Sequence, residues 1–139
     1  MQLLTNSKLK IITIIAGVIT LTACVNPVKK QHDALVGTWK ITDIDGLVIN
    51  SEKAQLNFSN TGNVTGNNGC NNIIGNYKPV HDHLNLSKLA ATRMACKGEE
   101  GEIERAFNQS LSKIEHFLVK GQQLFLTNEQ DITVISLQQ

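Results

Sequence analysis

The chain has 139 residues, a formal net charge of +1 and only six aromatic side chains: four Phe, one Trp and one Tyr. Its length suits a single domain that buries a core of its own. Nucleic-acid binding needs a basic excess or an open platform of aromatic rings, and this composition offers neither, so no nucleic-acid partner is expected.

Residues 1–23 have the pattern of a secretory signal. Lys8 and Lys10 precede an apolar run over residues 11–21, and small residues lead to Cys24. The run is too short for a spanning helix, which needs roughly 20 apolar residues. The Leu-Thr-Ala-Cys ending resembles the lipobox of bacterial lipoproteins, which implies that the signal is removed and that Cys24 carries lipid. The alternative is an ordinary signal peptide followed by an incidental cysteine.

Lipidation makes a membrane the first expected partner, because two or more acyl chains anchor a protein firmly. Val25, rather than aspartate, follows the cysteine. In a host with two membranes, the usual sorting rule then favours the outer membrane, with the protein facing the periplasm. Residues 24–34 are predicted to be a lipidated polar tether, and residues 35–139 the folded domain.

The cysteine count is odd, with Cys24, Cys70 and Cys96. Lipidation of Cys24 leaves one pair, and export to an oxidising compartment favours a disulfide between them. In the chain-entropy model, closing a loop of this size stabilises the fold by roughly 3.5 kcal/mol. Two separate buried thiols are the alternative.

The folded part is predicted to be mainly β (α+β). Ile103, Phe107, Leu111 and Ile114 recur at spacings of three and four, which predicts a helix over 99–114. The expected fold is a small antiparallel, lipocalin-like barrel, or a curved sheet, with this one inserted helix covering an opening. Alternating or short apolar runs predict strands over 35–44, 47–49, 53–59, 73–80, 84–91, 116–119, 124–126 and 132–136, with an Asp45-Gly46 turn after the first.

Several motifs occur in a fixed order: G-C-N at 69–71, G-x-Y at 75–77, T-x-M-A-C at 92–96 and E-x-x-F-x-x-x-L at 104–111. Together they resemble the META domain family, of the type of the heat-shock lipoprotein HslJ. The resemblance implies a lipocalin-like fold and an association with heat-shock response and novobiocin resistance. It implies no catalytic residues and no cofactor.

The expected function is therefore that of a non-enzymatic envelope lipoprotein with a stress-protective or partner-binding role. The expected protein partner is an envelope protein that the sequence does not identify. The alternative is a carrier that holds a small apolar ligand or acyl chain inside the barrel. A continuous apolar cavity of roughly a few hundred Å³ would favour the carrier, and an interior filled by large side chains would not. Trp39 is expected in the core rather than at a ligand.

The remaining candidate site residues have fewer supporting features in the sequence. Cys70 lacks the recognisable base that a nucleophile needs. His81 and His83 could share one face of a strand, but they lie at a predicted turn without an obvious third ligand, so no metal site is predicted. The charge of Arg93 is not explained by packing. Arg93 either pairs with acids of the following helix, which we favour, or contacts an anionic partner.

Overall fold

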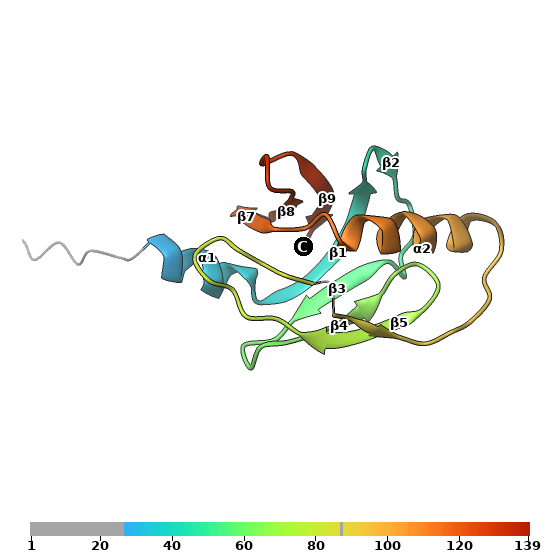
Figure 1. Cartoon of the computed structure of the whole chain (residues 1–139), viewed down its shortest axis with the longest axis horizontal. Coiled ribbons are helices and arrows are strands. Elements are labelled where there is room, and N and C mark those ends of the chain that lie inside the picture. The colour runs from blue at the N-terminus through green and yellow to red at the C-terminus, as the bar shows by residue number, and fades with distance from the viewer. Residues whose placement is uncertain (1–26, 87) are drawn as a thin grey trace, which may run out of the picture.

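The computed structural model describes residues 27–86 and 88–139. Within them, nine antiparallel strands form one sheet in the order β6-β5-β4-β3-β1-β9-β8-β7, with β2 paired to β1 (Figure 1). The elements are α1 (Pro27–Leu35), β1 (Gly37–Ile44), β2 (Leu47–Val48), β3 (Gln55–Phe58), β4 (Asn63–Asn67), β5 (Asn72–Asn76), β6 (Ala90–Ala91), α2 (Gly98–Leu111), β7 (His116–Lys120), β8 (Gln123–Thr127) and β9 (Thr133–Gln138).

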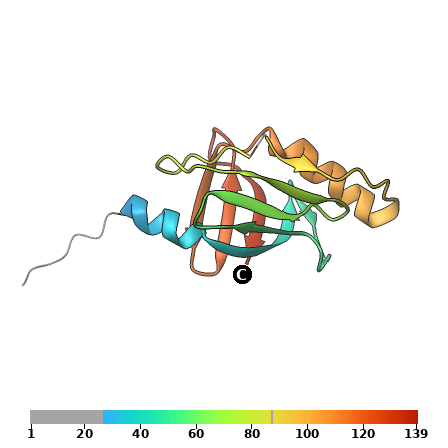
Figure 2. The same ribbon diagram turned by 90° about the horizontal axis from the view of Figure 1, so that it is seen from below.

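The sheet is strongly curved but not closed into a barrel. Its end strands, β6 and β7, are not paired with each other. Figure 2 shows the two helices at opposite ends of the curved sheet. Of the two architectures expected from the sequence, the curved sheet with an inserted helix is therefore the one found.

The central strand β1 shows how sequence and register place the core. Trp39 and Ile41 alternate inward and are fully buried. The register against β9 then shifts between Ile41 and Asp43, as in a β-bulge. Because of this shift, Ile44 rather than Asp43 continues the buried face. The Asp45-Gly46 turn follows, with positive φ at both residues, as predicted for this pair.

Helix α2 closes the core against this face. Ile103 and Phe107 are buried in the same cluster as Trp39 and Phe58, and Leu111 packs against the cluster from its edge. The predicted apolar face of the helix is thus confirmed, although the helix ends at Leu111 rather than at residue 114. Trp39 belongs to the core as expected.

Part of the segment expected to be a tether is helical. Pro27 begins α1, a position where its missing N–H is not needed. The indole nitrogen of Trp39 donates a hydrogen bond of 2.8 Å to the carbonyl oxygen of Leu35, the last residue of α1. Helix α1 is therefore joined to the domain core at its C-terminal end.

The outer edge of β7 is covered by helix α1 and by the segment that follows β5. The Gln31 side chain of α1 both donates to the Val119 carbonyl (3.1 Å) and accepts from the Val119 N–H (2.9 Å), as a neighbouring strand would. Further along, the N–H of Phe117 donates to the carbonyl of Asp82 at 2.8 Å. The segment after β5 and helix α1 together protect this edge from pairing with another chain.

The predicted signal peptide (1–23) and the predicted lipidation site, Cys24, lie outside the described residues. In the part of the chain that the structure describes, neither helix is long and apolar enough to cross a bilayer.

Candidate functional site

The family motifs meet at a disulfide. Cys70, between β4 and β5, is bonded to Cys96, just before α2, with the two Cα atoms 6.0 Å apart. The pair expected from the cysteine count is thus present in the structure. Gly69 permits the close approach of this loop to α2: it has a φ of +99°, and a Cβ there would lie 2.6 Å from the Ile103 side chain.

Asn71 forms a buried hydrogen-bonding centre beside the disulfide. Its side-chain oxygen accepts from the N–H of Met94 (2.7 Å) and the hydroxyl of Thr92 (2.8 Å). Its side-chain nitrogen donates to the Glu104 carboxylate at 2.8 Å and to the Met94 carbonyl at 3.3 Å. The oxygen of buried Asn68 in turn accepts from the N–H of Asn71 at 2.7 Å. Three motifs, distant in sequence, therefore share one polar network.

The network holds an exposed segment, residues 90–95, which we call the display loop. Every residue of this loop is exposed, and the Met94 side chain is 55% accessible. Arg93 makes no ion pair with any other described residue. The favoured expectation, that Arg93 pairs with acids of the following helix, is therefore wrong. Two of those acids have other partners: Glu104 accepts a hydrogen bond from Asn71, and Glu100 pairs with Lys53.

An apolar hollow lies between β5 and the first half of the display loop. It has a volume of about 300 Å³ and is lined by residues of β5 and β6 and by Thr92. Ile74, one of these residues, is 60% accessible. Ile74 faces Ala90 across the two strands. Strand β6 forms an end of the sheet, and no other described strand pairs with its outer edge. An exposed strand edge, an apolar surface and the Arg93 guanidinium, which has no ion pair with the described residues, therefore lie along one short segment.

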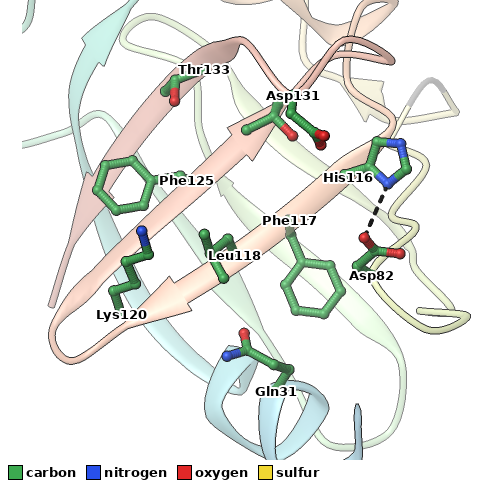
Figure 3. Close-up of a pocket in the computed structure, with 10 residues that line it drawn as sticks. Gln31, Asp82, His116, Phe117, Leu118, Lys120, Phe125, Asp131 and Thr133 are labelled. Carbon is green, nitrogen blue, oxygen red and sulfur yellow. Dashed lines mark ion pairs between the residues drawn. The ribbon is translucent and has the colours of Figure 1, made fainter. Parts of the chain in front are cut away.

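A second hollow, of about 440 Å³, lies on the outer face of β7 and β8 (Figure 3). Leu118 and Phe125, paired across these strands, form part of its lining. Asp82 and His116 lie at one side, and Gln31 of α1 lies at another. The hollow is open to solvent, so it does not have the form of an internal carrier cavity.

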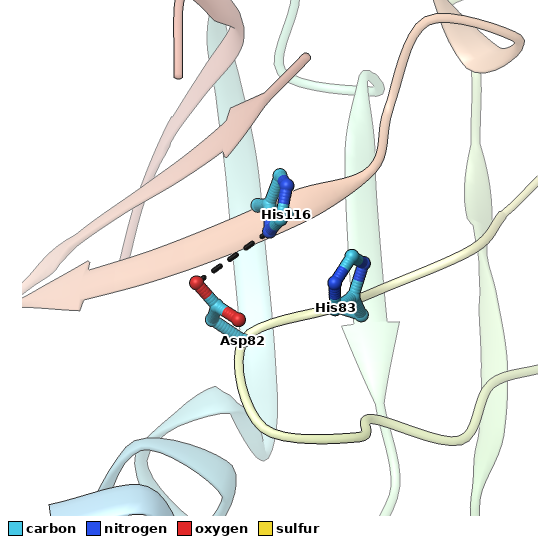
Figure 4. A group of neighbouring side chains, drawn as sticks. All are labelled: Asp82, His83 and His116. Atoms are coloured by element: carbon cyan, nitrogen blue, oxygen red, sulfur yellow. Dashed lines mark ion pairs between the residues drawn. The ribbon is translucent and has the colours of Figure 1, made fainter. Parts of the chain in front are cut away.

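The histidine pair considered from the sequence, His81 with His83, is not brought together as a clip. His81 has a φ of +60°, which breaks the alternation of a strand. His83 instead lies beside His116, with ring centroids 4.3 Å apart, and Asp82 lies beside both (Figure 4). No sequence spacing indicated His116, because it is 33 residues from His83 and reaches the group only through the sheet.

Among the described residues, the titratable groups with shifted pKa values are Asp45 and Tyr77. A hydrogen bond from Lys113 lowers the pKa of Asp45, helped by a bond from Ser110 and opposed by partial burial. Burial raises the pKa of Tyr77, whose hydroxyl donates to the Ser59 carbonyl at 2.7 Å. Both groups serve packing between elements and lie outside the display loop.

Comparison with known proteins identifies the fold. An NMR structure of a protein from Burkholderia xenovorans matches with a TM-score of 0.59 and 26% identity, over 76% of this chain and 83% of that one. Another NMR structure matches with a TM-score of 0.60 and 19% identity, over 77% of this chain and 92% of that one. A crystal structure of a DUF4847 family protein from Bacteroides vulgatus has a TM-score of 0.55 and 16% identity, over 77% and 94%.

Among curated protein sequences, none matches this chain. The family model described as META domain matches residues 32–139, which include the disulfide, the asparagine network and the display loop. The chain therefore belongs to the META domain family, as its motifs predicted.

Proposed function

We propose that this protein is a non-enzymatic, lipid-anchored envelope protein that protects the cell under stress by binding an anionic envelope partner through the display loop. The observation that carries the proposal is the contrast within residues 90–95. Their side chains are exposed. Their backbone is fixed by the hydrogen bond between the Met94 N–H and the Asn71 side chain, and by the adjacent Cys70–Cys96 disulfide.

Such an arrangement suits recognition, because a loop already fixed in its binding conformation loses little entropy when it binds. Arg93 is free of ion pairs with described residues and can offer its planar fork of donors to a carboxylate or phosphate. The apolar hollow beside β6 adds surface that excludes water around such a contact. Arg93 would therefore provide the specificity, and Met94 and Ile74 the apolar area.

The alternatives have less support. Cys70 forms a disulfide, so it has no free thiolate to act as a nucleophile. The space between sheet and helix is occupied by large buried side chains, among them Trp39, Phe58 and Phe107. A carrier would need that space for its ligand.

A photo-crosslinking residue at Met94 tests the binding surface in the full chain, expressed in its own cells. We expect a discrete adduct from this position and none from a matched exposed position, Glu129, on the β8–β9 turn. Arg93→Glu should reduce the Met94 adduct at least tenfold, because it places like charges together. Equal adducts from Glu129, or an adduct indifferent to Arg93→Glu, would contradict the proposal.

The anchor and the protective role need separate measurements. We expect Cys24→Ser to abolish labelling by a clickable fatty acid, and retained label would exclude the lipobox. Growth at high temperature and on novobiocin should be restored to a deletion strain by the wild-type chain but not by Arg93→Glu. Full rescue by Arg93→Glu would separate stress protection from the display loop.

A further inference from the structure

All four histidines of the chain lie where α1, the turn after β5 and β7 meet. His32 comes from α1, His81 and His83 from the turn, and His116 begins β7. The ring of His32 contacts the carbonyl oxygen of His81 and lies 6.0 Å from the ring of Phe117. This gathering comes from three separate parts of the sequence, so it depends on the fold rather than on any local motif.

Within this region, Asp82, His83 and His116 form a compact set of metal-ligand atoms. One carboxylate oxygen and one nitrogen from each imidazole lie within 4.8 Å of one another. The Nδ1 atom of His116 and the Oδ2 atom of Asp82 are 3.5 Å apart. Figure 4 shows the two rings and the carboxylate turned toward a common space.

His116 supplies a separate observation. Its Nδ1 atom is buried and has no hydrogen-bond partner among the described residues, although it faces the Asp82 carboxylate. A buried polar atom without a partner is unfavourable. A cation held between the nitrogen and the carboxylate would give both atoms a partner.

We propose that Asp82, His83 and His116 bind one Zn²⁺ ion, with the fourth coordination position left to water or to an outside donor. Zinc binds imidazole nitrogen and carboxylate oxygen at about 2.0–2.2 Å in tetrahedral geometry, so its ligand atoms are roughly 3.3 Å apart. The His116–Asp82 separation of 3.5 Å is already near this value. Asp82 and His83 are exposed, so their side chains can rotate to close the remaining distance.

The backbone holds the ligands in place before the ion arrives. His83 forms a β-bridge with His116, and the N–H of Phe117 donates to the carbonyl of Asp82. The bound ion would tie the turn to β7 and complete the protection of that edge. Because Asp82 and His116 also line the hollow over β7 and β8, the free coordination position has space for a ligand.

The test is a calorimetric titration of ZnCl₂ into the full chain, purified in detergent and stripped of metal with a chelator. We expect one Zn²⁺ per chain at micromolar affinity or better. Asp82→Asn and His83→Ala, both at exposed positions, should each weaken binding at least tenfold. His81→Asn is the matched control: it removes a neighbouring imidazole, and Asn tolerates the positive φ of that position, so affinity should not change.

A second readout identifies the ligands. On adding Zn²⁺, the ring signals of His83 and His116 should shift in NMR spectra, and those of His32 and His81 should not. No saturable binding, or equal loss of affinity in His81→Asn and His83→Ala, would overturn the proposal, since the latter outcome means loose binding by surface histidines. The site lies at the β7 edge and does not depend on the display loop, so Arg93→Glu should leave zinc affinity unchanged.

Discussion

At the scale of single residues, the asparagine-rich loop has a role that composition alone does not reveal. Asn68 and Asn71 are fully buried, whereas Asn72 in the same run is exposed. Asparagine and glycine favour turns, and the loop is a turn. Yet the Asn71 side chain also satisfies groups of Thr92, Met94 and Glu104, which come from two other motifs.

We expect Asn71→Ala to lower the free energy of unfolding by about 1–3 kcal/mol, because it leaves the Met94 N–H and the Glu104 carboxylate without a partner. Asn50→Ala, at an exposed position, should change it by no more than about 0.5 kcal/mol. Urea unfolding of the full chain measures both. If Asn71→Ala lowers the free energy of unfolding no more than Asn50→Ala does, water replaces the hydrogen bonds of Asn71 at no cost in stability.

Asp45 makes a pH-dependent contribution to the free energy of unfolding. Lys113 lowers the pKa of Asp45 below its ordinary 3.8, so the folded state favours the ionised form. Its contribution to stability is therefore complete above about pH 4 and is lost as pH falls through the folded-state pKa.

Lys113→Met should lower stability at neutral pH by only about 0.2–1 kcal/mol, since both partners are partly exposed. The difference between wild type and variant should shrink in strong acid, where Asp45 is protonated in both. Melting curves across pH test this, with Lys120→Met, at an exposed site outside any ion pair with described residues, as control. A difference that persists in acid would assign the effect of Lys113 to packing instead.

At the scale of elements, the helices complete a sheet that does not close on itself. Helix α2 buries Ile103 and Phe107 against β1 and its neighbours, while α1 covers the edge of β7 through Gln31. The edge of β6 has no such cover among the described residues. The sheet edge at β6, beside the display loop, is therefore accessible, whereas the edge at β7 is covered.

Phe107→Ala should cost about 3–5 kcal/mol, because it removes a fully buried ring and leaves a cavity between helix and sheet. Gln109→Ala, on the exposed face of α2, should change stability little. Thermal melts of the full chain separate the two variants. An unchanged melting temperature for Phe107→Ala would contradict a permanently packed helix and support a movable lid over a ligand.

At the scale of the whole molecule, the disulfide joins the β4–β5 loop to the segment that enters α2, across a sequence separation of 26 residues. Domains of this size have total stabilities of roughly 5–15 kcal/mol. One cross-link is therefore a substantial part of what holds the display loop in place.

We expect the Cys70→Ser, Cys96→Ser double variant to lose about 3.5 kcal/mol of stability, the chain-entropy value for a loop of this length. Reductant should lower the stability of the wild type by a similar amount and leave the variant unchanged. Urea unfolding with and without reductant measures both effects. If the cysteines of the wild type react with an alkylating agent without reductant, and reductant leaves its stability unchanged, both thiols are free in the protein and the disulfide is excluded.

Local patterns in the sequence determined much of this protein. Alternation predicted most of the strands, although β4 was not predicted and only Ala90–Ala91 of the strand expected over 84–91 is found. Spacings of three and four predicted α2 and its buried face, and Asp45-Gly46 predicted its turn. Counting cysteines predicted the disulfide, and the ordered motifs predicted the family. Each of these signals lies within a short window or is a simple count, so it can be read without knowing the fold.

Tertiary structure alone decided the rest. Four features join residues that are far apart in the chain. They are the β1 bulge against β9, the hydrogen bonds of Gln31 with Val119, the bond between Asn71 and Glu104, and the contact of the His83 and His116 rings. The pairing of Arg93 was predicted wrongly for the same reason: the distant residues Asn71 and Lys53 bind Glu104 and Glu100, two of the acids that adjacency suggested. A side chain's partner depends on which distant segments the curved sheet brings beside it, and local sequence does not contain that information.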